Sequence, residues 1–289
     1  MRDIVQKLER NILKTNLNKS SYWKKYLENR DYKNIYEMMN FGGYEDIKFF
    51  RSKLHFLLSF ILHGPKIFFS KTYLKYKKIY KKAKRQIIND TLRHVHAIEL
   101  IKRYISPKTI CVIGDGKANF VVGALLTFSK AKIISVNLSD TLINDLLILN
   151  KMNILKENEI HLVENLEEML DRNDKRLFLV PSNLKNFLYN KKIELFVNIA
   201  SFQEMNFNEI ENYMNIIKEN KAMFYCCNRE FKQLPDGEKI YFDRYPWGDG
   251  NKIFEEDCSW HKYYYQFRFP FFKEYDGIHK HCMIDYSKK

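Results

Sequence analysis

Two hydrophobic patterns divide the chain near residue 105. Up to about Tyr104, apolar residues recur at steps of three and four, the period of an amphipathic helix, and Gly42-Gly43 and Gly64-Pro65 interrupt the pattern. Further along, short apolar runs alternate with helical stretches. We therefore predict a helical N-terminal region over residues 1–105 and an α/β domain over residues 106–289.

Six short apolar runs in the second region have the length and the flanking residues of buried strands. They are Thr109–Ile113, Lys132–Asn137, Ile160–Val163, Arg176–Val180, Glu194–Ile199 and Ala222–Cys227. Strands that alternate with helices form βαβ units, so we expect a mostly parallel, Rossmann-like sheet covered on both faces. Nearer the C-terminus, Lys239–Asp243 and Trp260–Phe269 flank a loop rich in Gly and Pro, which predicts an antiparallel hairpin at the sheet edge.

The composition is that of a folded protein without a membrane span. The 289 residues are 45% hydrophobic and 15% aromatic, and this apolar content can offset the entropy cost of ordering the chain. The most apolar window, Leu54–Phe69, is interrupted by His, Gly, Pro and Lys, and falls short of the ~18 apolar residues of a membrane helix. Charged residues in Met1–Arg10 argue against a signal peptide. We expect a cytoplasmic protein.

The cysteines predict reduced thiols and no metal site. They are odd in number and offer neither a CxxC nor a Cys/His zinc spacing: Cys111, Cys226, Cys227, Cys258 and Cys282. His279 and His281 lie close to Cys282 in the sequence. No carboxylate or further His follows at ligand spacing, so we predict no metal there.

Positive charge is concentrated in the N-terminal third. The net charge is +14, and residues 1–105 contain 24 Lys and Arg against 9 Asp and Glu. Lys71–Arg85 has eight basic residues in fifteen. One face of this predicted basic helix is apolar and carries Tyr73, Tyr76, Tyr80, Ala83 and Ile87. The lysines form either a solvated face or a peripheral contact with anionic lipid headgroups at the inner face of the membrane, or with an acidic glycan. Attraction to nucleic acid is the least favoured interpretation.

A glycine turn follows the first predicted strand. Ile110–Asn119 reads ICVIGDGKAN and continues directly into an apolar helix. A strand, a glycine turn and a helix start form the nucleotide-binding corner of doubly wound sheets, because Gly lets the backbone approach a ligand closely. Asn119 stands where the third Gly of a dinucleotide fingerprint would be, which disfavours NAD. The candidate cofactor-binding residues are Gly114, Asp115, Gly116 and Asn119, with Asn137 at the end of the next strand; a tight turn without a ligand is the alternative.

A second polar segment follows the fifth predicted strand. Residues 198–205 read NIASFQEM and lie at the carboxyl end of that strand, where α/β sheets bind ligands. Asn206 and Glu209 have the spacing of a capping box for the next helix, which leaves Gln203 and Glu204 available for another role.

Three segments resemble the sugar O-methyltransferases that are encoded with bacterial surface-glycan genes. They are IGDGKANF at 113–120, NIASFQEM at 198–205 and NREFKQLPDGEKIYFDRYPW at 228–247. The resemblance covers roughly residues 90–270 and implies a class I methyltransferase fold, S-adenosyl-L-methionine as methyl donor, and a sugar, glycan or glycolipid acceptor in polysaccharide biosynthesis. Asn137 departs from the family by replacing the carboxylate that usually binds the ribose, which predicts a weaker cofactor affinity.

Methyl transfer to a hydroxyl also requires a group that accepts its proton. Glu204 is the first candidate base, and Asp243 and His261 on the predicted hairpin are the second candidates. The structural alternative for Glu204 is an ion pair with a nearby arginine. Ser201 joins the candidate cofactor contacts, and the candidate substrate-binding residues are Gln203, Arg229 and Arg244.

Two other functions stay open at this point. An RNA methyltransferase would account for the basic helix, since cationic side chains attract the phosphate backbone of any sequence. A nicotinamide-dependent or non-catalytic Rossmann module would account for the glycine turn alone.

Overall fold

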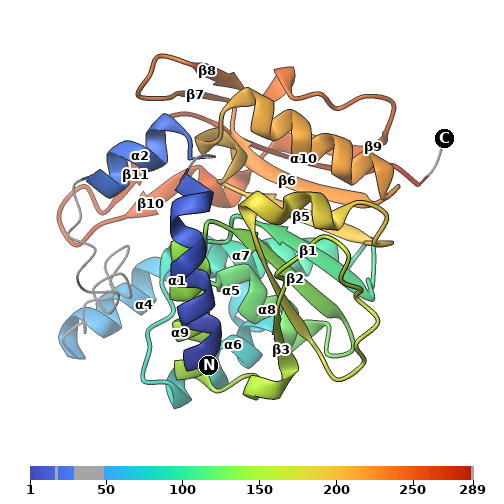
Figure 1. Ribbon diagram of the computed structural model, residues 1–289. Helices are drawn as coiled ribbons and strands as arrows, with labels where there is room; N and C mark the ends of the chain where they lie inside the picture. Colours follow the sequence, from blue (N-terminus) through green and yellow to red (C-terminus); the bar gives the residue numbers. More distant parts are fainter. Residues whose placement is uncertain (17–18, 29–48, 288–289) are drawn as a thin grey trace.

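The computed structural model describes residues 1–16, 19–28 and 49–287. Its centre is an eight-stranded sheet in which only one strand, β12, runs opposite to the others (Figure 1). In spatial order the strands are β3 (Ile160–Leu162), β4 (Leu177–Pro181), β2 (Lys132–Asn137), β1 (Thr109–Ile113), β5 (Leu195–Ile199), β6 (Met223–Arg229), β12 (His279–Asp285) and β9 (Asn251–Asp257). The mostly parallel, Rossmann-like sheet predicted from the sequence is confirmed.

The six predicted apolar runs are the first six strands, with ends within two residues of the prediction. They lack a polar face because helices cover both sides of the sheet. Ile110 and Val112 of β1 point into one hydrophobic core, and Cys111 and Ile113 point into the other.

Helices from both halves of the chain supply these two cores. The first core contains residues of α1 (Arg2–Asn16), α5 (Pro65–Phe68), α6 (Lys71–Lys82), α7 (Asn89–Ile101), α8 (Asn119–Thr127) and α9 (Ser139–Met152). The second contains residues of α10 (Phe207–Glu219) and of the 3-10 segment η2 (Ser182–Leu188). The N-terminal helices therefore share a core with the sheet: Leu8, Tyr76 and Val95 are fully buried in the same cluster as Ile110.

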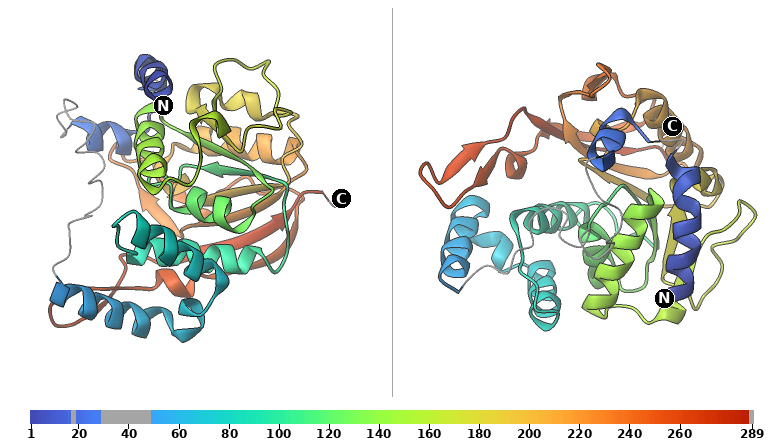
Figure 2. Two further views of the ribbon diagram at one scale, coloured as in Figure 1. Left: turned by 90° about the horizontal axis from the view of Figure 1, so that it is seen from below. Right: turned by 60° about the vertical axis from the view of Figure 1, so that its left-hand side comes forward.

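Helix α1 packs along α9, and two further N-terminal helices lie nearby (Figure 2). They are α2 (Ser21–Glu28), which follows α1 in the chain, and α4 (Phe49–His63), which contacts the short strand β10 (Tyr263–Tyr265). The predicted interruption at Gly42-Gly43 lies outside the described residues. In the described ranges, no helix combines the length and the apolar character that a membrane crossing requires.

The predicted basic helix is α6. Its apolar face is buried as expected, with Tyr73, Tyr76 and Tyr80 at most 5% exposed, because this face packs against α7 and α8. Its lysines point outward and are exposed. The amphipathic pattern of the sequence therefore correctly predicted which side of α6 packs against the core.

The C-terminal strands pair differently from the predicted hairpin. β8 (Lys239–Tyr241) pairs with β7 (Phe231–Gln233), and β10 (Tyr263–Tyr265) pairs with β11 (Phe272–Glu274), each in a separate two-stranded sheet. The antiparallel edge is formed by β12 and β9 instead. β12 lies between β6 and β9 and is buried on both faces, so its sequence, HKHCMID, shows no alternation of polar and apolar residues.

Four short 3-10 segments complete the described structure. They are η1 (Glu157–Glu159), η3 (Phe202–Glu204), η4 (Phe242–Arg244) and η5 (Ser259–His261). η3 follows β5 directly and carries residues of the NIASFQEM segment to the carboxyl edge of the sheet.

Candidate functional site

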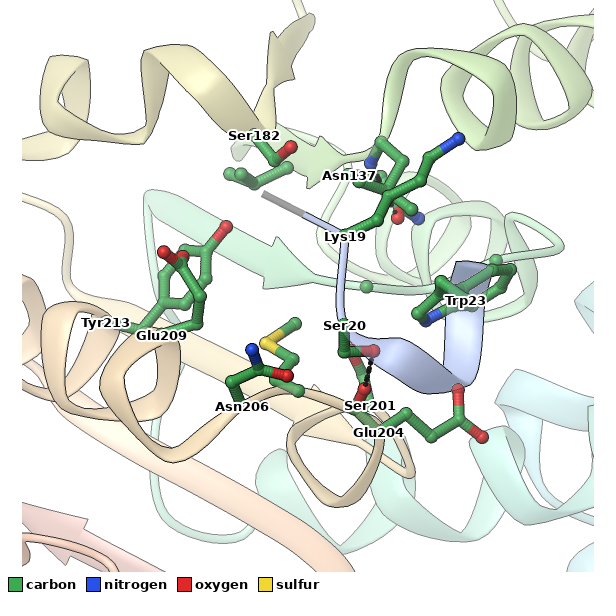
Figure 3. A pocket seen from close by; sticks show the side chains of 15 residues that line it. Lys19, Ser20, Trp23, Asn137, Ser182, Ser201, Glu204, Asn206, Glu209 and Tyr213 are labelled. Atoms are coloured by element: carbon green, nitrogen blue, oxygen red, sulfur yellow. Dashed lines mark hydrogen bonds between the residues drawn. The ribbon is translucent and has the colours of Figure 1, made fainter. Parts of the chain in front are cut away.

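A pocket lies at the carboxyl edge of the parallel strands (Figure 3). The strand order reverses at β1, with β2 on one side and β5 on the other, and such a switch point is where α/β sheets bind ligands. The pocket encloses about 610 Å³, including the part open to solvent. Residues after four different strands line it, among them Gly114, Asn137, Ser182, Ser201 and Glu204.

Two glycines of the turn line the pocket, although the Gly114 N–H already donates to the Val136 carbonyl oxygen (2.9 Å) and the Gly116 carbonyl oxygen accepts from Asn144 Nδ2 (3.2 Å). Gly114 and Gly116 have φ angles of 74° and 67°, which L-residues with side chains rarely adopt. A Cβ on Gly114 would lie 1.9 Å from Ser201 Oγ, so only Gly allows the turn and the β5 loop to come this close. A Cβ on Gly116 would meet no atom within 4 Å, so this residue borders open space.

Asp115 points away from the pocket, toward the start of α8. Its carboxylate accepts hydrogen bonds from the backbone N–H groups of Phe120 (3.0 Å) and Val121 (2.7 Å). Burial raises the pKa of this carboxyl group above its usual value. The first free amides of α8, which hold a phosphate in dinucleotide-binding folds, are therefore occupied by the protein's own side chain.

Asn119 connects the turn to the N-terminal helices. It is fully buried, and its Oδ1 accepts hydrogen bonds from Tyr80 Oη (3.0 Å) and Thr91 Oγ1 (3.3 Å). Its Nδ2 donates to Asp90 Oδ2 at 3.1 Å. The residue at the third-glycine position thus holds α6 and α7 against the turn and is not among the residues that line the pocket.

Ser182 and Asn206 both line the pocket, and the buried atoms Ser182 Oγ and Asn206 Oδ1 lack a hydrogen-bond partner among the described residues. Asn206 occupies the N-cap position of α10, as the sequence predicts, but its side chain makes no capping bond. Glu238 Oε1 accepts the Phe207 N–H at 2.9 Å instead, and Glu209 pairs with Lys185. The capping box is therefore not formed, and Asn206 is available to a ligand.

Glu204 lies at the rim of the pocket. Figure 3 shows its carboxylate directed away from the pocket centre and toward α2. Burial raises the pKa of this carboxyl group to about 7, against the opposing effects of the Lys232 charge, a hydrogen bond from Tyr22 and the Arg229 charge. A carboxylate with this pKa exchanges protons near neutral pH, which suits a general base.

The start of α2 and the two residues before it lie over the pocket, which the sequence did not predict. Lys19, Ser20 and Trp23 line it, and Ser20 Oγ donates to the Glu204 carbonyl oxygen at 2.5 Å. Lys19 Nζ lies 2.9 Å from Asp140 Oδ2, and both side chains are at most 4% exposed. No motif marks these residues, because their contacts join positions that are 121 and 184 residues apart in the sequence.

Gln203 and Arg229, two predicted substrate-binding residues, meet at the end of β6. Gln203 is buried, and its Oε1 accepts the backbone N–H of Arg229 at 2.7 Å. The Arg229 guanidinium lies 3.7 Å from Asp276 and within electrostatic reach of Glu204. Gln203 therefore fixes the end of β6 beside η3, whereas Arg229 stays close to the candidate base.

The other predicted residues lie elsewhere. Asp243 is exposed and pairs with Lys280 at 3.2 Å, and the Arg244 guanidinium lies over the Tyr241 ring at 4.5 Å. His261 is 2% exposed and belongs to a buried cluster of His and Cys. The structure brings Gly114, Gly116, Asn137, Ser201 and Glu204 together, but it leaves these three outside the residues that line the pocket.

Comparison with known proteins adds similarities of fold. No protein-family model matches the sequence, and no curated protein matches it either. An S-adenosylmethionine-dependent methyltransferase of Clostridium acetobutylicum shares 10% identity (TM-score 0.43; 74% of this chain and 98% of that chain). A Thermotoga maritima SAM-dependent O-methyltransferase shares 10% identity (TM-score 0.37; 66% of this chain and 63% of that chain). A Pyrococcus horikoshii protein described as a candidate RNA methyltransferase shares 9% identity (TM-score 0.44; 75% of this chain and 98% of that chain).

The strand order itself defines the class of fold. A parallel sheet that reverses at β1, with one antiparallel strand inserted between the last two parallel strands, is the Rossmann-like class I methyltransferase arrangement implied by the resemblance of the sequence.

Proposed function

We propose that this chain is an S-adenosyl-L-methionine-dependent O-methyltransferase whose acceptor is a sugar hydroxyl of a bacterial surface glycan or its precursor. The observation that carries the proposal is the pocket at the strand-order reversal, where the Gly114–Gly116 turn faces Asn137 and Ser201. Backbone groups of the turn and the Asn137 amide would hold the nucleoside part of the cofactor. The cofactor supplies an electrophilic methyl group when it is bound.

The chemistry of the pocket favours a nucleoside without phosphates. Asp115 already occupies the amides at the start of α8 and places a carboxylate where a pyrophosphate would need donors. Lys19, the one lysine among the described residues that line the pocket, is paired with Asp140. Open space beside Gly116, and the oxygens of Ser182 and Asn206 that lack a partner among the described residues, suit the neutral, hydroxyl-bearing nucleoside part of the cofactor.

Glu204 is the group we assign to accept the proton of the acceptor hydroxyl. Its carboxylate is surrounded by Tyr22, Arg229 and Lys232, which are hydrogen-bonding or cationic side chains suited to a polyhydroxylated or acidic sugar. Because the carboxylate points toward α2, the acceptor would approach Glu204 from the α2 side of the pocket. The sugar as acceptor rests on the resemblance of the NIASFQEM and NREFKQLPDGEKIYFDRYPW segments.

Calorimetry with S-adenosylhomocysteine tests the cofactor assignment. We expect binding to the wild type, no binding of NAD, and loss of S-adenosylhomocysteine binding in Gly116→Val, whose side chain would fill the open space. Gly64→Val is the matched control. Gly64 has a similar φ (73° against 67°) and an equally open Cβ position, but it does not line the pocket. Equal loss of binding in both variants would refute the assignment.

Acceptor screening tests the substrate class. The enzyme would be incubated with labelled S-adenosylmethionine and either nucleotide-activated and lipid-linked sugars or total RNA at near-physiological salt. We expect label in an alkali-stable ether on a sugar. Label in RNA would favour the RNA methyltransferase interpretation, because the exposed lysines of α6 would attract the phosphate backbone of RNA.

A further inference from the structure

Three potential metal ligands lie close together on the side of the sheet that faces the first hydrophobic core, outside the candidate cofactor pocket. Cys227 lies on β6, Cys258 follows β9, and His261 lies on η5. All three are at most 2% exposed, and their ligand atoms lie within 4.8 Å of one another. The Sγ atom of Cys227 is 3.9 Å from Nδ1 of His261. The cluster cannot be recognised in the sequence, because Cys227 and the segment from Cys258 to His261 come together only through the strand order β6-β12-β9.

The same place contains buried nitrogen atoms without partners. His261 Nε2 and His279 Nδ1 make no hydrogen bond to any described residue, and the two rings lie with their centroids 4.8 Å apart. Nε and one terminal nitrogen of Arg93 are also buried and unpartnered in the described chain, and the Arg93 charge interacts with both thiols. Buried polar atoms without a partner are rare in native proteins, and a bound ion is one way to satisfy those that lie beside the two thiols.

We propose that Cys227, Cys258 and His261 bind a Zn²⁺ ion, with His279 as the fourth ligand. Two sulfurs and two imidazole nitrogens in tetrahedral arrangement are a preferred donor set of zinc. Tetrahedral Zn–S and Zn–N bonds place ligand atoms about 3.5–3.8 Å apart, so the three side chains need to close by about 1 Å or less. The ring centroid of His279 lies 4.8 Å from that of His261, so a rotation of the His279 ring would bring one of its nitrogens toward the ion.

The surroundings suit the ion electrostatically. Two thiolates balance the two charges of Zn²⁺, and the unpartnered N–H groups of Arg93 would donate hydrogen bonds to the sulfurs. Metal binding would release the thiol protons of both cysteines to solvent.

The site would fix one wall of the candidate cofactor pocket. The carbonyl oxygen of Cys227 accepts the N–H of Ala200 at 2.8 Å, and the next residue, Asn228, accepts the Gln203 N–H through its side chain. Zinc at Cys227 therefore joins the end of β6 to the connection between β9 and β10. Its role is structural, because none of its ligands lines the pocket.

Metal analysis of the untagged protein, purified without chelators, tests the proposal. We expect about one zinc per chain in the wild type and at least a tenfold loss in Cys227→Ser and Cys258→Ser. Cys226→Ser is the matched control, since this buried neighbour points into the opposite core and should keep the metal. Chelation should lower the Tm of the wild type by about 5 °C and leave the Tm of Cys227→Ser unchanged.

Cobalt substitution keeps the test valid if a variant fails to fold. Adding Co²⁺ to metal-depleted wild type should produce ligand-field bands of a tetrahedral ion and a thiolate-to-cobalt charge-transfer band. Chains without zinc that give no such bands, a Cys227–Cys258 disulfide found by mass spectrometry, or equal zinc in Cys227→Ser would each overturn the proposal. S-adenosylhomocysteine binding is measured separately, so failure of the metal site and failure of the proposed function can be distinguished.

Discussion

The assignment of Glu204 as the base makes a quantitative prediction about pH. Its pKa of about 7 lies above the usual 4.5 because burial disfavours the carboxylate. At pH 6 about one tenth of the chains have the base form, and at pH 8 about nine tenths do, so the rate should rise about tenfold between these values. Glu204→Gln should lower kcat by about 10²–10⁴-fold and abolish this rise, with cofactor binding nearly unchanged.

A second variant identifies the titrating group. The Lys232 charge lowers the pKa of Glu204, so Lys232→Met should move the midpoint of the pH profile above 7. Lys239→Met is the matched control, because Lys239 is exposed on the neighbouring strand of the same small sheet and should leave the midpoint in place. The assay is initial-rate methyl transfer under saturating cofactor from pH 5.5 to 9.

Stability measurements separate chemistry from folding. Because the folded pKa of Glu204 is above the unfolded value, its ionisation opposes folding as pH rises from about 4.5 through about 7. Glu204→Gln should therefore be at least as stable as the wild type at pH 8. A variant with normal turnover, or a wild-type profile that is flat from pH 6 to 8, would remove Glu204 from the reaction.

Three further predictions concern other parts of the molecule. Lys19→Met should lower the free energy of unfolding, measured in urea, by about 3 kcal/mol, because it leaves Asp140 buried without its partner. The double variant Lys19→Met/Asp140→Leu should recover most of this loss. A single variant as stable as the wild type would argue against the buried pair. Gly114→Ala should weaken S-adenosylhomocysteine binding at least tenfold in calorimetry by colliding with Ser201 Oγ, and Ser201→Gly in the same chain should restore part of it; no rescue would show that strain alone is responsible. Four exposed lysines of α6 can be changed to Glu together: Lys77, Lys78, Lys81 and Lys82. This change should abolish salt-sensitive binding to anionic liposomes, whereas wild-type binding that is equal at low and high salt would indicate that these lysines form only a solvated face.

The sequence predicted the sheet where strands are covered on both faces. Their apolar runs are continuous, so β1 to β6 could be located within two residues. It did not predict β12, because His279 and His281 suggest a polar segment although both are at most 8% exposed. Burial of polar residues depends on neighbouring strands, and these are set by the order of the sheet rather than by local pattern.

The candidate site was predicted as far as it depends on strand ends. Gly114, Gly116 and Glu204 follow β1 and β5 directly, and their position at the carboxyl edge follows from the parallel topology. The direction of a side chain at such a position is not encoded in its spacing, and Asp115 turns toward the amides of α8. The arrival of Lys19 over the pocket depends on the packing of α1 along α9.

A crystal structure of the chain with S-adenosylhomocysteine would locate the cofactor. We expect adenosine over the turn from Gly114 to Gly116, with its ribose beside Asn137 and its sulfur facing the loop that carries Ser201 and Glu204. Adenosine bound elsewhere, or a pocket that stays closed by the Lys19–Trp23 segment at saturating ligand, would contradict it.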